Sequence, residues 1–128
     1  MDRIDIIKYP EKHGIQNVYV EINFEENLKD IIECSGNKQK FAALYKQRLK
    51  YLDENLEKCI LYNEWFEKLV DADPFYSMRF NKFSGNPRIL FCFTKHFGKK
   101  IAILCHCFCE KKGSKDYARN IKIAKNIL

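Results

Sequence analysis

The stretch RILFCFTKHFGKKIAILCHCFC, residues 88–109, decides the fold of this chain. Two apolar runs rich in Ile, Leu, Phe and Cys flank Phe97 and Gly98, a pair typical of a tight turn. Runs of this length that are bounded by turn residues are typical of strands. We therefore predict strands at residues 88–96 and 100–109, joined by the turn.

Two further strands are predicted upstream of this hairpin. Residues 75–80 form another short apolar run, and the loop that follows contains Gly85 and Pro87. The three consecutive strands indicate an antiparallel meander. Nearer the N-terminus, apolar and polar residues alternate over residues 18–24, which predicts a half-buried strand.

Apolar residues at three- and four-residue intervals predict helices on both sides of the meander in the sequence. Asn27 and Asp30 resemble a capping box that starts the first helix. Asn63 is placed to cap a short helix that contains Trp65, Phe66 and Leu69. The other helical segments are the stripe from Phe41 to Cys59, which includes Arg48, and residues 115–128 with Tyr117, Ile121 and Ala124 on one side.

The order of elements predicts the fold class. Strand, helices, three strands and helix indicate an α+β fold with an N-terminal strand, helices packed on one face of an antiparallel sheet, and a C-terminal helix. The other face would then be free to bind a partner. At 128 residues, with no linker or internal repeat, the chain is expected to form a single domain.

The charge of the chain is divided unevenly along its length. Residues 75–128 contain twelve Lys and Arg against two acidic residues, a net charge of +10, whereas residues 1–74 have a net charge of −4. Concentrated basic side chains attract polyanions, and counterion release from phosphates supplies most non-specific nucleic-acid affinity. Nucleic acid is therefore the first expected partner. The alternative is a solvated, lysine-rich surface that only promotes solubility.

Export and membrane signals are not evident in the sequence. No stretch approaches the roughly 20 apolar residues needed to cross a bilayer. Asp2, Asp5 and Lys8 interrupt the apolar residues at the N-terminus, which argues against a signal peptide. We expect a cytoplasmic protein with no membrane interaction, in which the six cysteines are free thiols.

Cys105, Cys107 and Cys109, with His106 between them, suggest a zinc site, but strand geometry argues against one. On one strand the three thiols would share a face about 6.6 Å apart, whereas tetrahedral zinc needs its sulfur ligands within roughly 4 Å of one another. His106 would point to the opposite face. We expect small buried side chains here, and no metal or other cofactor.

Several cations and a histidine are predicted to lie on one sheet face. His106 shares its face with Phe108 and Glu110, and Arg79 and Arg88 lie inside neighbouring strands. Such a group suits metal-free RNA cleavage, in which a base removes the 2′-OH proton, cations stabilise the phosphorane and an acid protonates the 5′ oxygen. The structural alternatives are a hydrogen-bonded core histidine and, for each arginine, a surface ion pair with an acidic N-terminal helix.

Four short motifs in this order resemble the phage-derived Gp49-like, or HigB-like, branch of the RelE/ParE toxin superfamily. The match is firm over residues 75–128 and extends weakly back to Lys40, whereas residues 1–16 fall outside it. The chain departs from the family pattern at four points: Ser77 replaces the usual Glu, Cys107 replaces a small Gly or Ala, Glu110 moves a lysine pair one position later, and no Pro precedes the last helix. The motifs are Met78-Arg79-Phe80, residues 88–91, residues 101–108 followed by Lys111-Lys112, and Ala124-Lys125.

The resemblance implies a RelE-like fold and a toxin of a type II toxin–antitoxin pair. Such a toxin is a ribosome-dependent endonuclease on mRNA that inhibits translation, and a helix-turn-helix antitoxin neutralises it. The catalytic positions carried over are Arg79, Arg88, His106 and Tyr117, the last as a candidate acid or base. The RNA-binding positions are Lys82, Lys95, Lys111, Lys112, Lys115 and Arg119.

Two other functions stay open on sequence alone. One is a non-catalytic protein on the same fold that binds an antitoxin or nucleic acid through its basic surface. The other is a gyrase-directed toxin on that fold.

Overall fold

A computed structural model describes residues 6–8, 14–81, 83–110 and 114–127 of the chain, of which residues 6–8 and 114 are described in their backbone only. The described strands form one six-stranded sheet in the order β1-β2-β6-β5-β4-β3. The strands are β1 (Ile6–Lys8), β2 (Val18–Glu21), β3 (Phe66–Lys68), β4 (Tyr76–Arg79), β5 (Pro87–His96) and β6 (Lys99–Cys109). The helices are α1 (Phe24–Cys34), α2 (Lys38–Asn55), the 3-10 helix η2 (Leu56–Leu61) and α3 (Ser114–Ile127).

The predicted meander is confirmed, and with it the α+β class. β4 pairs antiparallel with β5, and β5 pairs antiparallel with β6 over almost its whole length. Phe97 and Gly98 form the connecting turn with positive φ angles of 51° and 79°. Positive φ at both central residues is the conformation that matches the right-handed twist of a two-residue hairpin.

The prediction that the sheet is wholly antiparallel is wrong at one pairing. β2 lies parallel to β6, with Val18 opposite Ala102, so the sheet is mixed. Tight turns force neighbouring strands to be antiparallel, but β2 is followed by α1 and α2 before the chain returns to the sheet. With so long a connection, β2 can pair either parallel or antiparallel with its neighbour.

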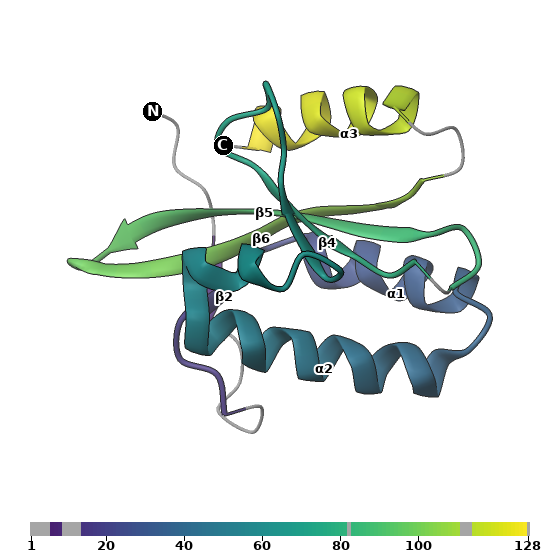
Figure 1. Ribbon diagram of the computed structural model, residues 1–128, viewed down its shortest axis with the longest axis horizontal. Helices are drawn as coiled ribbons and strands as arrows, with labels where there is room; N and C mark the ends of the chain where they lie inside the picture. The colour runs from purple at the N-terminus through teal and green to yellow at the C-terminus, as the bar shows by residue number, and fades with distance from the viewer. Residues whose placement is uncertain (1–5, 9–13, 82, 111–113, 128) are drawn as a thin grey trace.

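The prediction that all helices cover one face of the sheet is also wrong. Figure 1 shows α1 and α2 beneath the sheet and α3 above it. The α3 residues Tyr117, Ile121 and Ala124 pack in a cluster with Leu90 and Ile103 of the sheet. β5 and β6 are apolar on both faces, so both faces have to be covered to keep them from water.

Two local predictions between β2 and β4 fail because side-chain and strand contacts override the local pattern. The strand β2 ends at Glu21, whose carboxylate accepts hydrogen bonds from the Asn23 backbone N–H (3.0 Å) and side chain (3.3 Å). This turn starts α1 at Phe24, so Asn27 and Asp30 lie inside the helix and form no capping box.

The short helix predicted after Asn63 is instead an edge strand. Phe66 in β3 lies opposite Met78 in β4, and Trp65 lies in the turn before β3. A three-residue strand gives little periodic signal, and the open edge of β4 supplies the hydrogen-bonding partner that fixes it.

A bulge in β6 changes the expected positions of the cysteines. Leu90 lies opposite His106 and Phe91 lies opposite Leu104, so Cys105 is an extra residue in β6. As a result Cys105 packs on the α3 side of the sheet and Cys107 on the α1 and α2 side. The prediction that these thiols share a face is therefore wrong.

Arg48 is the charged residue at the centre of an aromatic stack on the α2 side. Its guanidinium lies 4.1 Å from the ring centroid of Phe80 and 5.1 Å from that of Trp65. Phe41 stacks on Phe80 at 4.4 Å, and Tyr62 stacks on Trp65 at 4.1 Å. Burial lowers the pKa of Arg48 to about 10, so the group stays charged at neutral pH inside the stack.

Candidate nucleic-acid site

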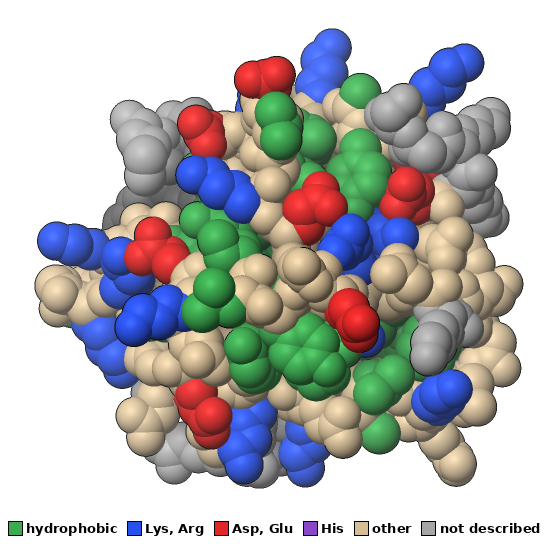
Figure 2. All heavy atoms as spheres, in the orientation of Figure 1, with side chains coloured by type: hydrophobic (Ala, Val, Ile, Leu, Met, Phe, Trp, Pro, Cys, Tyr) green, Lys and Arg blue, Asp and Glu red, His purple; other side chains and the backbone are tan. Residues whose placement is uncertain are grey.

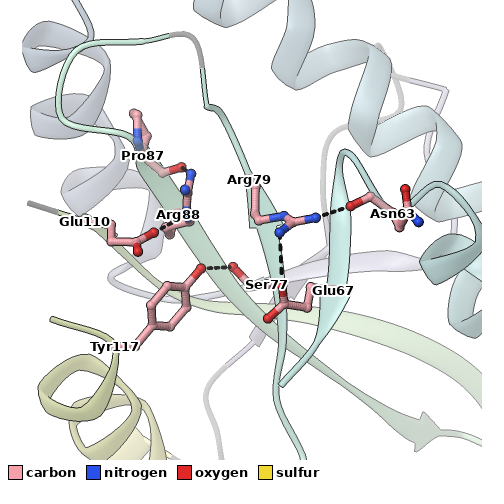
Figure 3. Close-up of polar contacts among 8 residues, drawn as sticks. All are labelled: Asn63, Glu67, Ser77, Arg79, Pro87, Arg88, Glu110 and Tyr117. Carbon is pink, nitrogen blue, oxygen red and sulfur yellow. Dashed lines mark hydrogen bonds and ion pairs between the residues drawn. The ribbon is translucent and has the colours of Figure 1, made fainter. Parts of the chain in front are cut away.

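Arg79 and Arg88 meet on the α3 side of the sheet. They are direct cross-strand neighbours of the antiparallel pair β4 and β5. In Figure 3 Arg88 and Tyr117 lie on one side of Ser77 and Arg79 lies on the other, and each arginine is in an ion pair with a glutamate. The sheet and α3 therefore bring together three of the four residues predicted to be catalytic, and we refer to these residues and their polar partners as the network.

Arg79 is held at the open edge of the sheet. Its Nη1 lies 3.0 Å from Oε2 of Glu67 on β3, and its Nη2 donates to the carbonyl of Asn63. The side chains of Arg79 and Glu67 are 24% and 46% exposed, so water reaches this ion pair. The Arg79 carbonyl accepts a hydrogen bond from Nη1 of Arg48, which anchors this part of β4 from the other face.

Arg88 is held more tightly and farther from water. Its Nε donates to Oε2 of Glu110 at 2.8 Å, and its Nη1 donates to the carbonyl of Pro87 at 3.1 Å. The side chain is only 8% exposed. The structural alternative for each arginine, an ion pair with an acidic N-terminal helix, holds only in that both form ion pairs, because Glu67 lies on a strand and Glu110 directly follows β6.

Tyr117 lies beside these ion pairs and makes a polar contact of its own through its hydroxyl. Its Oη lies 3.0 Å from Oγ of Ser77, and its ring packs edge-on against Phe108 at 5.2 Å. Burial raises the pKa of Tyr117 above its usual value, so the phenol keeps its proton at neutral pH. Ser77 lies directly opposite Glu67 across β4 and β3, and Figure 3 shows Ser77 between Tyr117 and Glu67.

His106 joins β6 to α3. Its Nε2 lies 2.7 Å from Oδ1 of Asn120, a buried residue whose Nδ2 donates to the Asp116 carbonyl at 2.7 Å. Because Oδ1 is then the acceptor, the His106 Nε2 carries the proton. The ring also stacks against Phe108, at 6.2 Å between centroids. This geometry matches the structural alternative for His106, a histidine hydrogen-bonded within the fold.

Three of the six predicted RNA-binding residues lie in the described part of the chain, on β5 and α3. Lys95 lies near the far end of β5, seven residues and about 23 Å along the strand from Arg88. Lys115 and Arg119 are exposed on α3, where Arg119 pairs with Asp116 at 3.2 Å. Lys82, Lys111 and Lys112 lie outside the described residues.

Four residues of the network were not predicted as site residues: Glu67, Ser77, Glu110 and Asn120. Glu67 was placed in a helix by its local pattern, so its position beside Arg79 could not be anticipated. Ser77 was noted only as a substitution in the family motif. Asn120 carried no signal, because an isolated Asn on a helix has no characteristic partner.

The network is electrically balanced. Two guanidinium groups face two carboxylates, so a phosphate group competes with a carboxylate for each arginine. The ion pair of Arg79 and Glu67 is the one suited to exchange, because pairs that water reaches contribute at most about 1 kcal/mol. The less exposed pair of Arg88 and Glu110 is better suited to hold β5 and the end of β6 together.

A separate cleft of about 510 Å³ lies on the α2 side. Lys40, Arg48 and Trp65 are among its lining residues, whereas none of the four predicted catalytic residues lines it. Over the ranges that the structure describes, no group of three or more His, Cys, Asp and Glu side chains is placed to hold a metal ion.

Comparison of the chain with protein-family models, curated proteins and solved structures finds no match. No helix in the described part of the chain is both long and apolar enough to span a membrane.

Proposed function

We propose that this protein is a toxin of a type II toxin–antitoxin pair, of RelE-like fold, that cleaves mRNA on the ribosome in the cytoplasm and is neutralised by a helix-turn-helix antitoxin. The observation that carries the proposal is the grouping of Arg79, Tyr117 and Glu67 around Ser77 on one side of the sheet. The order of strand, helices, meander and C-terminal helix is consistent with the family motifs.

The grouping supplies the parts of metal-free RNA cleavage. When an RNA phosphate takes the place of Glu67 on Arg79, the freed carboxylate lies beside it as a general base for the 2′-OH proton. The 2′ oxygen then bonds to phosphorus, and the bond from phosphorus to the 5′ oxygen breaks. Arg79 stabilises the charge that develops on phosphate, and the protonated Tyr117 donates a proton to the departing 5′ oxygen. The products are a 2′,3′-cyclic phosphate and a 5′ hydroxyl.

Induction in a bacterial host tests this proposal. The wild-type protein should arrest growth and create new 5′ ends in translated mRNA, and Arg79→Ala should remove both effects. Lys38→Ala is the matched control, because it removes an exposed ion pair of similar length (3.3 Å, with Glu33) far from the network. Arg88→Ala is less informative, since it leaves Glu110 without its partner and destabilises the fold.

A non-catalytic function is the second candidate, and the charge balance of the network favours it. Both arginines are neutralised by glutamates, which is the arrangement expected of a structural network. In that case the protein binds an antitoxin or nucleic acid without cleaving it. Growth arrest without new mRNA ends, or no arrest with RNA binding retained, would favour this candidate.

A further inference from the structure

The tip of the β5–β6 hairpin projects from the body of the molecule (Figure 1) and ends in an aromatic side chain. Phe97 is 97% exposed, the highest exposure among the large apolar residues that the structure describes. Its backbone φ is 51°, in the left-handed region that Gly and Asn adopt readily and bulky residues rarely do. The fold therefore holds a large ring in water at a position where Asn would suit the turn better.

The ring of Phe97 continues an aromatic column that rises from the sheet. His96 packs edge-on against Phe97, with 4.4 Å between centroids, and against Tyr19 of β2 at 5.2 Å. The column supports the tip from one side and leaves almost all of the Phe97 ring open to a flat partner.

The tip is also basic on both sides of the hairpin. Lys95 and Lys100 lie directly opposite each other on one side, and Lys99 lies opposite His96 on the other. Lys100 pairs with Glu57, but within the described ranges Lys95 and Lys99 have no ion-pair partner. Lys95 and Lys99 are therefore the cations of the tip that are available to a phosphate. Figure 2 shows Lys and Arg side chains gathered at the left end, where the hairpin projects.

We propose that this tip is a binding site for single-stranded RNA, in which a base stacks on Phe97 and the flanking phosphates contact Lys95 and Lys99. An exposed ring between cations is the combination that single-stranded nucleic acid requires, and stacking needs no particular base. One ring surrounded by lysines offers little apolar area to a bilayer, which disfavours a membrane as the partner. The tip lies roughly 30 Å along β5 from Arg88, so this site does not depend on cleavage.

The test measures binding of the full-length protein to a fluorescently labelled, unstructured 12-nucleotide RNA. Phe97→Asn should weaken binding by about 5- to 100-fold, the range expected for one stacked base. The same substitution should raise Tm by about 3–6 °C because it relieves the backbone at the turn, so weaker binding cannot come from unfolding. Phe97→Trp should bind within about threefold of the wild type. Val70→Asn, at an 86% exposed apolar residue elsewhere, should leave binding unchanged.

The charge contribution is tested by the salt dependence. Replacing both Lys95 and Lys99 with Ala should reduce the slope of log K against log salt by about 1.4, which corresponds to two phosphate contacts on a single strand. The proposal is overturned if the wild type does not bind the RNA, or if Phe97→Asn binds it as tightly as the wild type. Binding to phosphatidylglycerol vesicles that depends on Phe97, while RNA binding does not, would assign the tip to a membrane surface instead.

Discussion

Replacement of Arg48 by Met tests the stack that supports the candidate site from the opposite face. Met keeps most of the side-chain volume but removes the charge and the hydrogen bond to the Arg79 carbonyl. The carbonyl left without a partner costs about 1–3 kcal/mol. The two lost ring contacts cost about 0.5–2 kcal/mol each. Part of this loss of stability is offset, because the Met side chain avoids the cost of burying a charge, the same cost that lowers the Arg48 pKa.

The expected net loss is about 2 kcal/mol of the free energy of unfolding, or about 6–10 °C in Tm. Thermal unfolding followed by circular dichroism measures it. Lys46→Met is the control, because Lys46 is an exposed residue on the same helix and its replacement should change stability by less than about 0.5 kcal/mol. An Arg48→Met protein that unfolds within 1 °C of the wild type would refute the assignment of Arg48 to a stabilising stack.

Three further predictions concern thiols and the anchoring of α3. Burial raises the pKa of Cys59 and of Cys107 to about 12, so the folded protein keeps protons on these thiols that the unfolded chain loses above pH 9. The free energy of unfolding, measured with urea, should therefore fall by about 1.4 kcal/mol per thiol between pH 8 and pH 10. Ellman's reagent at pH 8 should react rapidly with the exposed Cys34 and slowly with these two, until denaturant exposes all the thiols; equal rates in the native protein would contradict their burial. Asn120→Ala should lower stability by about 1–3 kcal/mol, because it leaves the His106 Nε2–H without its acceptor; an unchanged Tm would rule out this anchor.

The meander could be predicted because its signals are local. Residues 88–109 contain two apolar runs and a two-residue turn, and the structure follows them closely. The strand β3 could not be predicted, because it is fixed by pairing with β4 rather than by its own sequence. The start of α1 at Phe24 was missed because the turn in which Glu21 accepts from Asn23 matches no capping pattern. The bulge at Cys105 could not be predicted either, because nothing in an apolar run distinguishes the residue that is left unpaired between the two strands.

The candidate site was predictable only in part. The predicted meander placed Arg79 and Arg88 on neighbouring strands correctly, and α3 adds Tyr117 on the same side of the sheet. Their partners were not predictable, because Glu67 comes from the edge strand that local pattern assigned to a helix. The acidic and basic halves of the sequence also meet in the folded chain. Glu67 comes from the acidic half and pairs with Arg79 from the basic half, and Figure 2 shows acidic and basic side chains interspersed.

We propose that Glu67 and its neighbours cleave RNA, and a cleavage assay on ribosomes tests this directly. Purified wild-type protein and Glu67→Gln are each added to ribosomes programmed with end-labelled mRNA, and the rate and end chemistry of cleavage are recorded. The wild type should produce ends with a 2′,3′-cyclic phosphate, and Glu67→Gln should cleave about 10²- to 10⁴-fold more slowly. Its Tm should shift by no more than about 4 °C, because the ion pair it replaces is exposed. Intact mRNA with the wild type, or equal cleavage by the two proteins, would contradict the claim.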